Sequence, residues 1–439
     1  MRFFDRKEEI ATLQHIQKQS FDNAQFTVVT GRRRVGKTHL VWKAYEGVQM
    51  LYFFVSRKAE RELCGDYMDE IRNKLGIATL GNATCFADIF EFLMKLSVDR
   101  PITLFIDEFQ DFYRVNRSIY SDMQRIWDMY HNRARINLIV CGSIFSMMSK
   151  IFRDEKEPLY NRQTRMMTVK PFTPSVLKEI IAEYNHNYSA DDLLALYSFT
   201  GGVAKYVGIL VDAGATTKSR MIDHIISADS IFLGEGKATL IEEFGKDYGV
   251  YFSILSAIAR GKTSRAEIEA VVGREIGGYL TKLEAEYEVI SKQLPIFATS
   301  SGRNLRYVID DNFFSFWFRF IYKYNYMLEI ENYEALRTII NRDYDTFSGL
   351  MLGRYFKSMM VESRQYTRIG SWWDRKGENQ IDIIAENELN DSVTFVEVKR
   401  NAANYDACVL RNKIAAFTRA SGRYEHYAVE QRCLSLLDM

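Results

Sequence analysis

Short apolar runs and amphipathic stretches alternate over the first 170 residues of the chain. A run of five or six mainly apolar residues is typical of a buried strand, and apolar residues at helical spacing indicate a helix. The pattern predicts strands over 26–30, 51–55, 102–106, 136–141 and 166–170, and helices over 1–24, 39–44, 59–75 and 87–96. Strands that alternate with helices indicate an α/β fold with a doubly wound parallel sheet, which binds ligands at the carboxyl ends of its strands.

Helical spacing dominates from 172 to 232, and a compact group of three helices follows. The first covers 251–258, and a capping box of Ser264 and Glu267 starts the second. With a third helix and a wing over 289–297, this spacing is the plan of a winged helix.

The third helix of this group extends from Arg274 to Glu286 and carries mixed charge. Arg274 and Lys282 are basic, but several glutamates share the helix, which makes a poor surface for a phosphate backbone. The composition therefore favours a structural or partner-contacting wing over a DNA reader. The aromatic stretch over 307–318 is typical of core rather than binding surface, and helices are expected to continue to about 364.

Two apolar strands over 380–385 and 392–399 predict a hairpin near the end of the chain. Asp382 lies on the first strand, and Glu397 and Lys399 lie two apart on one face of the second. Two carboxylates brought together could hold a hard divalent cation, and a neighbouring lysine could orient or deprotonate water. This chemistry suits phosphodiester hydrolysis; a solvated strand surface is the alternative.

Composition narrows the class of protein. The chain has 439 residues, of which 47% are hydrophobic and only five are proline, so we expect two to four globular domains. The net charge of +1 excludes a uniformly basic nucleic-acid binder. No apolar run is long enough to cross a membrane, and the charged start does not resemble a secretory signal. Five scattered cysteines without a CxxC pair fit a reducing cytoplasm and argue against disulfides or zinc.

A phosphate-binding loop follows the first expected strand. The segment Gly31-Arg32-Arg33-Arg34-Val35-Gly36-Lys37-Thr38 fits the pattern G-x-x-x-x-G-K-[ST] between a strand and a helix. Glycines allow backbone N–H groups to approach phosphates closely. Lys37 is expected to neutralise β- and γ-phosphate oxygens and Thr38 to hold Mg²⁺. This predicts a site for a nucleoside triphosphate and Mg²⁺; a chance glycine turn is the alternative.

Polar residues also end two later strands. Asp107 and Glu108 follow 102–106 in a Walker B pattern, in which Asp107 binds the Mg²⁺ hydration shell and Glu108 polarises the attacking water. Gly142 and Ser143 follow 136–141, where Ser143 is either a γ-phosphate sensor or part of an ordinary turn.

These motifs resemble the archaeal-type ATPase family within the AAA+/STAND group of P-loop ATPases. The segment Pro158-Leu159-Tyr160-Asn161-Arg162 resembles a Pro-Leu-Tyr-Gly-Arg segment of that family, with Asn161 in place of glycine. The ATPase resemblance implies that the nucleotide is ATP. It also implies that Arg162 contacts the γ-phosphate, in cis or across a subunit interface; a surface ion pair is the alternative.

The end of the chain resembles the PD-(D/E)xK nuclease superfamily. Asp382, Glu397 and Lys399 match its motif, and the segment Gly370-Ser371-Trp372-Trp373-Asp374-Arg375-Lys376-Gly377 resembles the nuclease-like domain that follows these ATPases. Lys357 and Gln380 stand where relatives often carry glutamate, which weakens the expected metal site.

The resemblance implies four domains: a P-loop ATPase core over 1–171, a helical lid over 172–240, a winged helix over 241–305, and connecting helices with a restriction-endonuclease-like α/β domain over 306–439. Two functions remain open. One is an ATP-hydrolysing protein whose metal-dependent nuclease-like domain acts on DNA, which the winged helix also contacts. The other is a nucleotide-gated switch whose nuclease-like domain is a non-catalytic docking module. A second copy or another protein is a further expected partner, and a membrane is not.

Overall fold

The computed structural model describes residues 1–77, 83–245, 248–298, 304–375 and 377–439. They form two compact units, one of residues 5–170 and one of residues 1–4 with 171–439. Lys376, which belongs to one of the family-like segments, lies outside the described residues.

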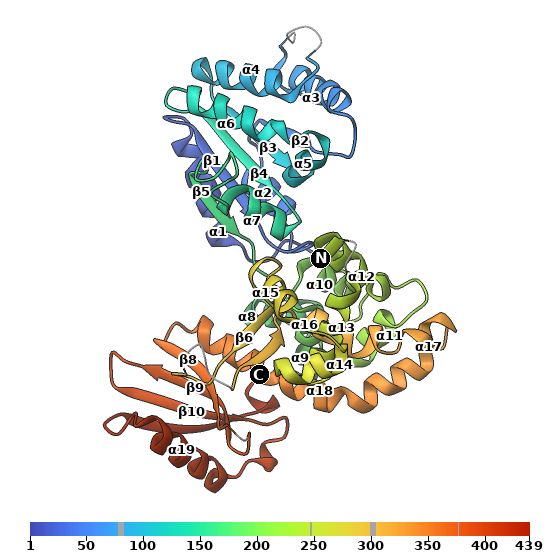
Figure 1. The fold of residues 1–439 in the computed structure, drawn as a ribbon, viewed down its shortest axis with the longest axis vertical. Helices are drawn as coiled ribbons and strands as arrows, with labels where there is room; N and C mark the ends of the chain where they lie inside the picture. Colours follow the sequence, from blue (N-terminus) through green and yellow to red (C-terminus); the bar gives the residue numbers. More distant parts are fainter. Residues whose placement is uncertain (78–82, 246–247, 299–303, 376) are drawn as a thin grey trace. The chain divides into compact units, whose positions relative to one another are not determined.

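The first unit is built on a five-stranded parallel sheet (Figure 1). Its strands are β1 (Gln25–Thr30), β2 (Met50–Phe54), β3 (Ile102–Asp107), β4 (Ile136–Cys141) and β5 (Arg165–Thr168). They lie in the order β2-β3-β4-β1-β5, and every neighbouring pair is parallel. The parallel α/β sheet predicted from the sequence is therefore confirmed.

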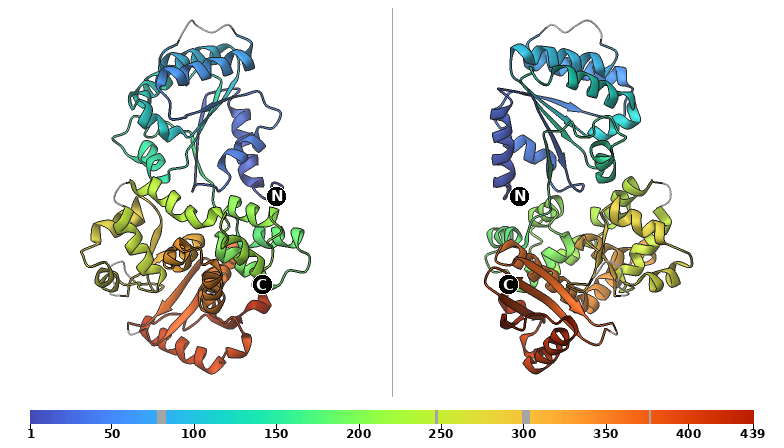
Figure 2. Two further views of the ribbon diagram at one scale, coloured as in Figure 1. Left: turned by 90° about the vertical axis from the view of Figure 1, so that its right-hand side faces the viewer. Right: turned by 60° about the vertical axis from the view of Figure 1, so that its left-hand side comes forward.

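Helices cover both faces of this sheet (Figure 2). One face packs against α1 (Lys7–Gln19) and α2 (Lys37–Ala44), and the other against α3 (Glu60–Leu75), α4 (Phe86–Asp99), α6 (Ser118–Tyr130) and α7 (Phe145–Arg153). A short turn of η1 (Phe109–Asp111) and α5 (Phe112–Val115) follows β3. The sequence did not predict α6 or α7, although Ile119, Met123 and Ile126 are buried at helical spacing.

The second unit begins with the helices expected over 172–232. They are α8 (Pro174–Tyr184), α9 (Ala190–Thr200), α10 (Ala204–Asp212) and α11 (Lys218–Ile225), followed by α12 (Ile231–Phe244). The first residues of the chain join this unit: Phe4 is buried in its core, and the amino group of Met1 pairs with Asp212.

Three helices and a hairpin come next. They are α13 (Tyr248–Ala259), α14 (Arg265–Val272), α15 (Gly277–Ala285), β6 (Ile290–Gln293) and β7 (Arg306–Ile309), and β6 pairs antiparallel with β7. The predicted capping box is present, because Ser264 and Glu267 exchange hydrogen bonds at the start of α14. The sequence did not predict β7.

The aromatic stretch over 307–318 is core, as predicted. Phe313, Phe316, Trp317 and Phe318 are all buried in the main apolar cluster of the second unit. The stretch contributes to α16 (Asn312–Phe316) and to a π-helix, η3 (Trp317–Tyr322), which α17 (Asn325–Glu329) and the long helix α18 (Tyr333–Glu362) follow.

A four-stranded mixed sheet closes the chain. Its strands are β8 (Arg368–Trp373), β9 (Gln380–Asn387), β10 (Ser392–Val398) and β11 (Ala428–Leu434), in the order β11-β10-β9-β8. The predicted hairpin of β9 and β10 is confirmed, β8 is antiparallel to β9, and β11 is parallel to β10. Helix α19 (Ala407–Ser421) packs on one face through Phe417, and the end of α18 packs near the other through Met360.

Short 3₁₀ turns, η4 (Ala402–Asn404) and η5 (Leu436–Asp438), complete this region. Among the helices of the described ranges, none is long and apolar enough to cross a membrane.

Candidate functional site

The loop over 31–38 connects the carboxyl end of β1 to α2. Gly31 has a φ of +139°, and a Cβ placed on it would lie 2.4 Å from the carbonyl oxygen of Val169. Gly36 has a φ of +93° and caps the start of α2. Both positions need glycine, because a side chain is either blocked by backbone or strained by the φ angle. This explains the two glycines of the motif in structural terms.

The four residues between these glycines shape the loop. Arg34 has a left-handed φ of +71°, and Val35 is buried against the α1 and α2 face of the sheet. Arg32 and Arg33 are half-buried. One hydrophobic anchor and three arginines therefore surround the start of α2.

Lys37 and Thr38 begin α2 and face in two directions. The Lys37 ammonium is buried and donates to the carbonyl oxygens of Gly31 at 2.8 Å and Arg32 at 2.9 Å. The Thr38 hydroxyl donates to Oδ2 of Asp107 at 2.9 Å. The structure thus brings Thr38 and Asp107, both predicted Mg²⁺ residues, into direct contact.

Asp107 ends β3 and is buried. Burial raises the pKa of its carboxyl, and the hydrogen bond from Thr38 acts in the opposite direction. The Tyr52 hydroxyl also donates to Oδ2, at 3.3 Å, and the Glu108 backbone N–H donates to Oδ1 at 3.0 Å. The contact of Tyr52 could not be predicted, because its partner Asp107 lies 55 residues further along the chain.

Glu108 follows in a left-handed conformation, with a φ of +54°. Its Oε2 accepts from the Ser143 hydroxyl at 2.6 Å and from Nε2 of Gln110 at 2.6 Å. Ser143 follows Gly142 at the end of β4, the strand that lies between β1 and β3. The strand order therefore gathers Thr38, Asp107, Glu108 and Ser143 at one edge of the sheet. Gln110 joins this group, although the sequence assigned it no role.

Arg162 lies elsewhere. Arg165 pairs with Thr27 near the start of β1, so Arg162 lies at the amino edge of the sheet, about 20 Å along β1 from the loop at roughly 3.3 Å per residue. Its guanidinium pairs with Asp128 at 3.1 Å and donates to the Tyr160 carbonyl at 2.9 Å. The predicted cis contact with a phosphate on this loop is wrong, because an arginine side chain cannot cover that length. The ion pair is the alternative that the sequence left open.

The second predicted site lies on β9 and β10. Asp382 accepts from the Val398 backbone N–H at 2.8 Å and from the Gln380 amide at 3.3 Å. Glu397 accepts from the Lys399 ammonium at 2.9 Å and, through both oxygens, from Lys413 of α19 at 2.8 and 3.0 Å. The hairpin thus brings the predicted residues together, with Lys413 as an added member.

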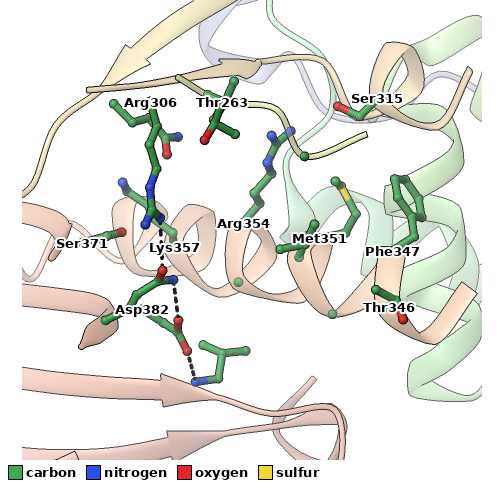
Figure 3. Close-up of a pocket in the computed structure, with 18 of the residues that line it drawn as sticks. Thr263, Arg306, Ser315, Thr346, Phe347, Met351, Arg354, Lys357, Ser371 and Asp382 are labelled. Atoms are coloured by element: carbon green, nitrogen blue, oxygen red, sulfur yellow. Dashed lines mark hydrogen bonds between the residues drawn. The ribbon is translucent and has the colours of Figure 1, made fainter. Parts of the chain in front are cut away.

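These contacts do not fit a divalent cation. Glu397 is buried, and two ammonium groups already neutralise its charge. Burial raises the pKa of Asp382, as it does that of Asp107, so the pairing of Glu397 with two ammonium groups is what sets this site apart. Within the described ranges, no group of three or more His, Cys, Asp or Glu side chains could hold a metal. Lys357 lines the same cavity as Asp382 and Glu397, so a cation occupies the position where the resemblance led us to look for an acid. Figure 3 shows Lys357 and Asp382 in this cavity.

Comparison with known proteins relates this geometry to a family. Residues 3–210 match the model of a family described as an ATPase domain predominantly from Archaea. Residues 317–409 match a second family, described as Archaea bacterial proteins of unknown function. An uncharacterized protein of Methanocaldococcus jannaschii is 29% identical over 407 residues, which are 90% of this chain and 87% of that protein.

Two solved structures share the fold. The Walker-type ATPase of Pyrococcus abyssi is 20% identical with a TM-score of 0.54, covering 72% of this chain and 96% of that one. The ORC2 protein of Aeropyrum pernix is 13% identical with a TM-score of 0.50, covering 76% of this chain and 94% of that one. Residues 3–210 therefore match the archaeal ATPase-domain family, and the parallel sheet and the loop over 31–38 agree with that match.

Proposed function

We propose that this chain binds ATP with Mg²⁺ at the loop over 31–38 and hydrolyses it. The observation that carries the proposal is the set of contacts in which Thr38 donates to Asp107 and Ser143 donates to Glu108, at the carboxyl ends of three neighbouring strands. The Aeropyrum pernix ORC2 protein, which has a similar fold, is a complex with ADPNP and ADP.

The residues at the carboxyl edge of the parallel sheet suit both the phosphates of ATP and Mg²⁺. The close backbone approach at Gly31 leaves the loop without a side chain there, as phosphates require. The Thr38 hydroxyl and the Asp107 carboxylate are oxygen ligands of the kind that Mg²⁺ prefers, and Mg²⁺ neutralises charge on the β- and γ-phosphates when bound.

Each side chain has a separate task in this proposal. Lys37 exchanges its loop carbonyl partners for phosphate oxygens. Glu108 accepts the proton of the attacking water, and Ser143 and Gln110 fix the orientation of its carboxylate through their 2.6 Å hydrogen bonds. Asp107 stays hydrogen-bonded to Thr38 and keeps that hydroxyl in place.

Nucleotide binding and turnover of two variants test the proposal. We expect Lys37→Ala to lose ATP binding, and Glu108→Gln to keep ATP binding and lose hydrolysis. Lys43→Ala is the matched control, because Lys43 lies on the same helix and pairs with the exposed Glu46. Normal turnover in Glu108→Gln would refute its assignment as the base.

For the second unit, we propose that α13, α14, α15 and the β6–β7 hairpin form a winged helix and that the final sheet is a nuclease-like fold. Support comes from the order of these elements and from Asp382, Glu397 and Lys399 on adjacent strands. The pairing of Glu397 with Lys399 and Lys413 favours a non-catalytic binding module whose state follows the bound nucleotide. ATP then acts as the signal of a switch.

Metal-dependent cleavage of DNA is the competing proposal, and one assay separates the two. Linear and circular DNA is incubated with Mg²⁺ or Mn²⁺ and either the full chain or Lys399→Ala. We expect no cleavage by either protein. Cleavage by the full chain that disappears in Lys399→Ala would establish the nuclease instead.

A further inference from the structure

A large cavity in the second unit carries more positive than negative side chains. It has a volume of about 750 Å³ and lies between the β6–β7 hairpin, α18 and the final sheet. Its carboxylates are already engaged: Glu397 pairs with Lys399 and Lys413, Asp345 pairs with Arg400, and Asp382 accepts two hydrogen bonds. The remaining positive charge needs another partner.

Four cations supply that remaining charge: Arg306 from β7, Arg319 from η3, and Arg354 and Lys357 from α18. Arg319 donates to the Ala259 carbonyl, and the other three carry the argument. In Figure 3, Arg306 extends from the hairpin toward α18, and Lys357 and Arg354 extend from α18 into the same space. Among the described residues, no carboxylate lies within ion-pair distance of any of them. Asp310 and Asp311 act on Arg354 only from beyond ion-pair distance, where they favour its charged form. The cavity therefore concentrates positive charge from separate elements without a directly paired carboxylate.

Arg306 and Arg354 bond to neutral groups, which leaves their charge and some of their N–H donors available to an anion. Arg306 donates to the Gln380 amide oxygen at 3.1 Å and stacks on the Trp373 ring at 4.2 Å, and Arg354 donates to Asn312 at 3.0 Å. No hydrogen bond of the Lys357 ammonium is found within the described part of the chain. Burial lowers the pKa of all three groups. Holding three such charges together is unfavourable unless an anion is bound.

We propose that this cavity binds a phosphate monoester of nucleotide size, held by Arg306, Arg354 and Lys357. Two guanidinium forks and one ammonium match the several oxygens of a dianionic phosphate. The volume lies within the range of small-ligand sites, which hold molecules of nucleotide size. A free nucleotide and the 5′-phosphorylated end of a strand share this chemistry. The cavity is also lined by Asp382, Glu397 and Lys399, so the inference rests on the proposed binding module and names its ligand class. It does not depend on ATP hydrolysis at the loop over 31–38, and DNA cleavage lost in Lys399→Ala would refute the module without deciding phosphate binding.

Calorimetric titration of the full chain tests the site with three probes: AMP, a 5′-phosphorylated thymidine hexanucleotide, and the same hexanucleotide with a 5′-hydroxyl. We expect Lys357→Met and Arg306→Gln each to weaken binding of a phosphorylated probe by at least about tenfold, since a hydrogen bond to a charged group contributes about 1.5–3 kcal/mol. Arg342→Gln is the control, because Arg342 lies on the exposed part of α18, paired with Asp343. Lys37→Ala should bind the probe as the unaltered chain does.

The outcomes decide the proposal and its ligand. Binding of AMP alone identifies a free nucleotide as the ligand, and binding of the phosphorylated strand alone identifies a strand end. Four results would overturn the proposed phosphate site. They are equal binding of both hexanucleotides, loss of binding in Lys37→Ala, equal effects of Arg342→Gln and Lys357→Met, and no binding of any probe. Lys357→Met should also unfold at a slightly higher urea concentration, because an unpaired buried charge is removed, so weaker binding cannot be ascribed to misfolding.

Discussion

The close approach of Gly31 to Val169 makes a quantitative prediction for Gly31→Ala. The new Cβ would lie 2.4 Å from the Val169 carbonyl oxygen, well inside van der Waals contact. That carbonyl cannot retreat freely, because the Val169 N–H donates to the Thr30 carbonyl at 2.8 Å and so fixes the segment beside β1. Relief of the clash must therefore shift backbone on both sides.

Two costs combine in this variant. A non-glycine residue at a φ of +139° costs about 1–3 kcal/mol, and a forced contact with backbone adds about 1–3 kcal/mol. Gly47→Ala separates the two, because Gly47 has a φ of +80° in the same unit and a Cβ there meets nothing within 4 Å. Gly47→Ala should show the first cost alone, so the variants should differ by about 1–3 kcal/mol.

Amide hydrogen exchange measured by mass spectrometry on peptides of β1 gives the free energy of opening. We expect these amides to exchange roughly 5- to 150-fold faster in Gly31→Ala than in Gly47→Ala, since about 1.4 kcal/mol corresponds to a tenfold change. Gly31→Ala should also lose ATP binding. Equal exchange in the two variants, with ATP binding retained, would refute the requirement for a bare backbone at Gly31.

Three further predictions concern other parts of the chain. Arg162→Ala should leave ATP turnover within about twofold, because Arg162 forms a partly exposed ion pair with Asp128 and a hydrogen bond to the Tyr160 carbonyl. Turnover per molecule that rises with protein concentration and is lost in this variant would indicate a role at a second copy's site. Arg400→Met should cost about 2 kcal/mol in urea unfolding of the second unit. Burial raises the pKa of Asp191, but neighbouring cations including Arg400 outweigh it and hold the pKa below its ordinary value of 3.8. The Asp191 contribution is therefore present above about pH 4 and lost as pH falls through the lower folded pKa, and Arg400→Met should flatten this acid loss. Gly236→Ala places a Cβ 2.3 Å from the buried Trp317 ring, which should cost about 1–2 kcal/mol despite the better helix propensity of alanine, as thermal unfolding would show.

The sequence predicted features that a short stretch of chain determines. The loop over 31–38, the acids that end β3, the β9–β10 hairpin and the Ser264 capping box depend on residues next to one another, so their patterns are visible without the fold. The parallel sheet also followed from the alternation of apolar runs and helices. Its strand order did not, because it depends on crossovers that no local pattern records.

Partners far apart in the sequence could not be predicted. Lys413 reaches Glu397 from a different element and removes the charge that a metal would need. Asp128 pairs with Arg162 across 34 residues, and the register of β5 on β1 decides at which edge of the sheet that arginine lies. Strand β7 was missed for the same reason, since only its pairing with β6 makes it a strand.

The length of α18 has a mechanical consequence for the second unit. Its 30 residues span about 45 Å without a break, and it packs against α8, α9 and α11 as well as against all three antiparallel strands of the final sheet. A tilt of about 5° around its middle would displace each end by about 2 Å, as rigid geometry requires for this length. Near its first turns, Arg337 donates to the Ile226 carbonyl at 2.7 Å, while Lys357 lies near its other end. Because α18 is continuous, a displacement of one end of the helix moves the other end as well, with no hinge between them.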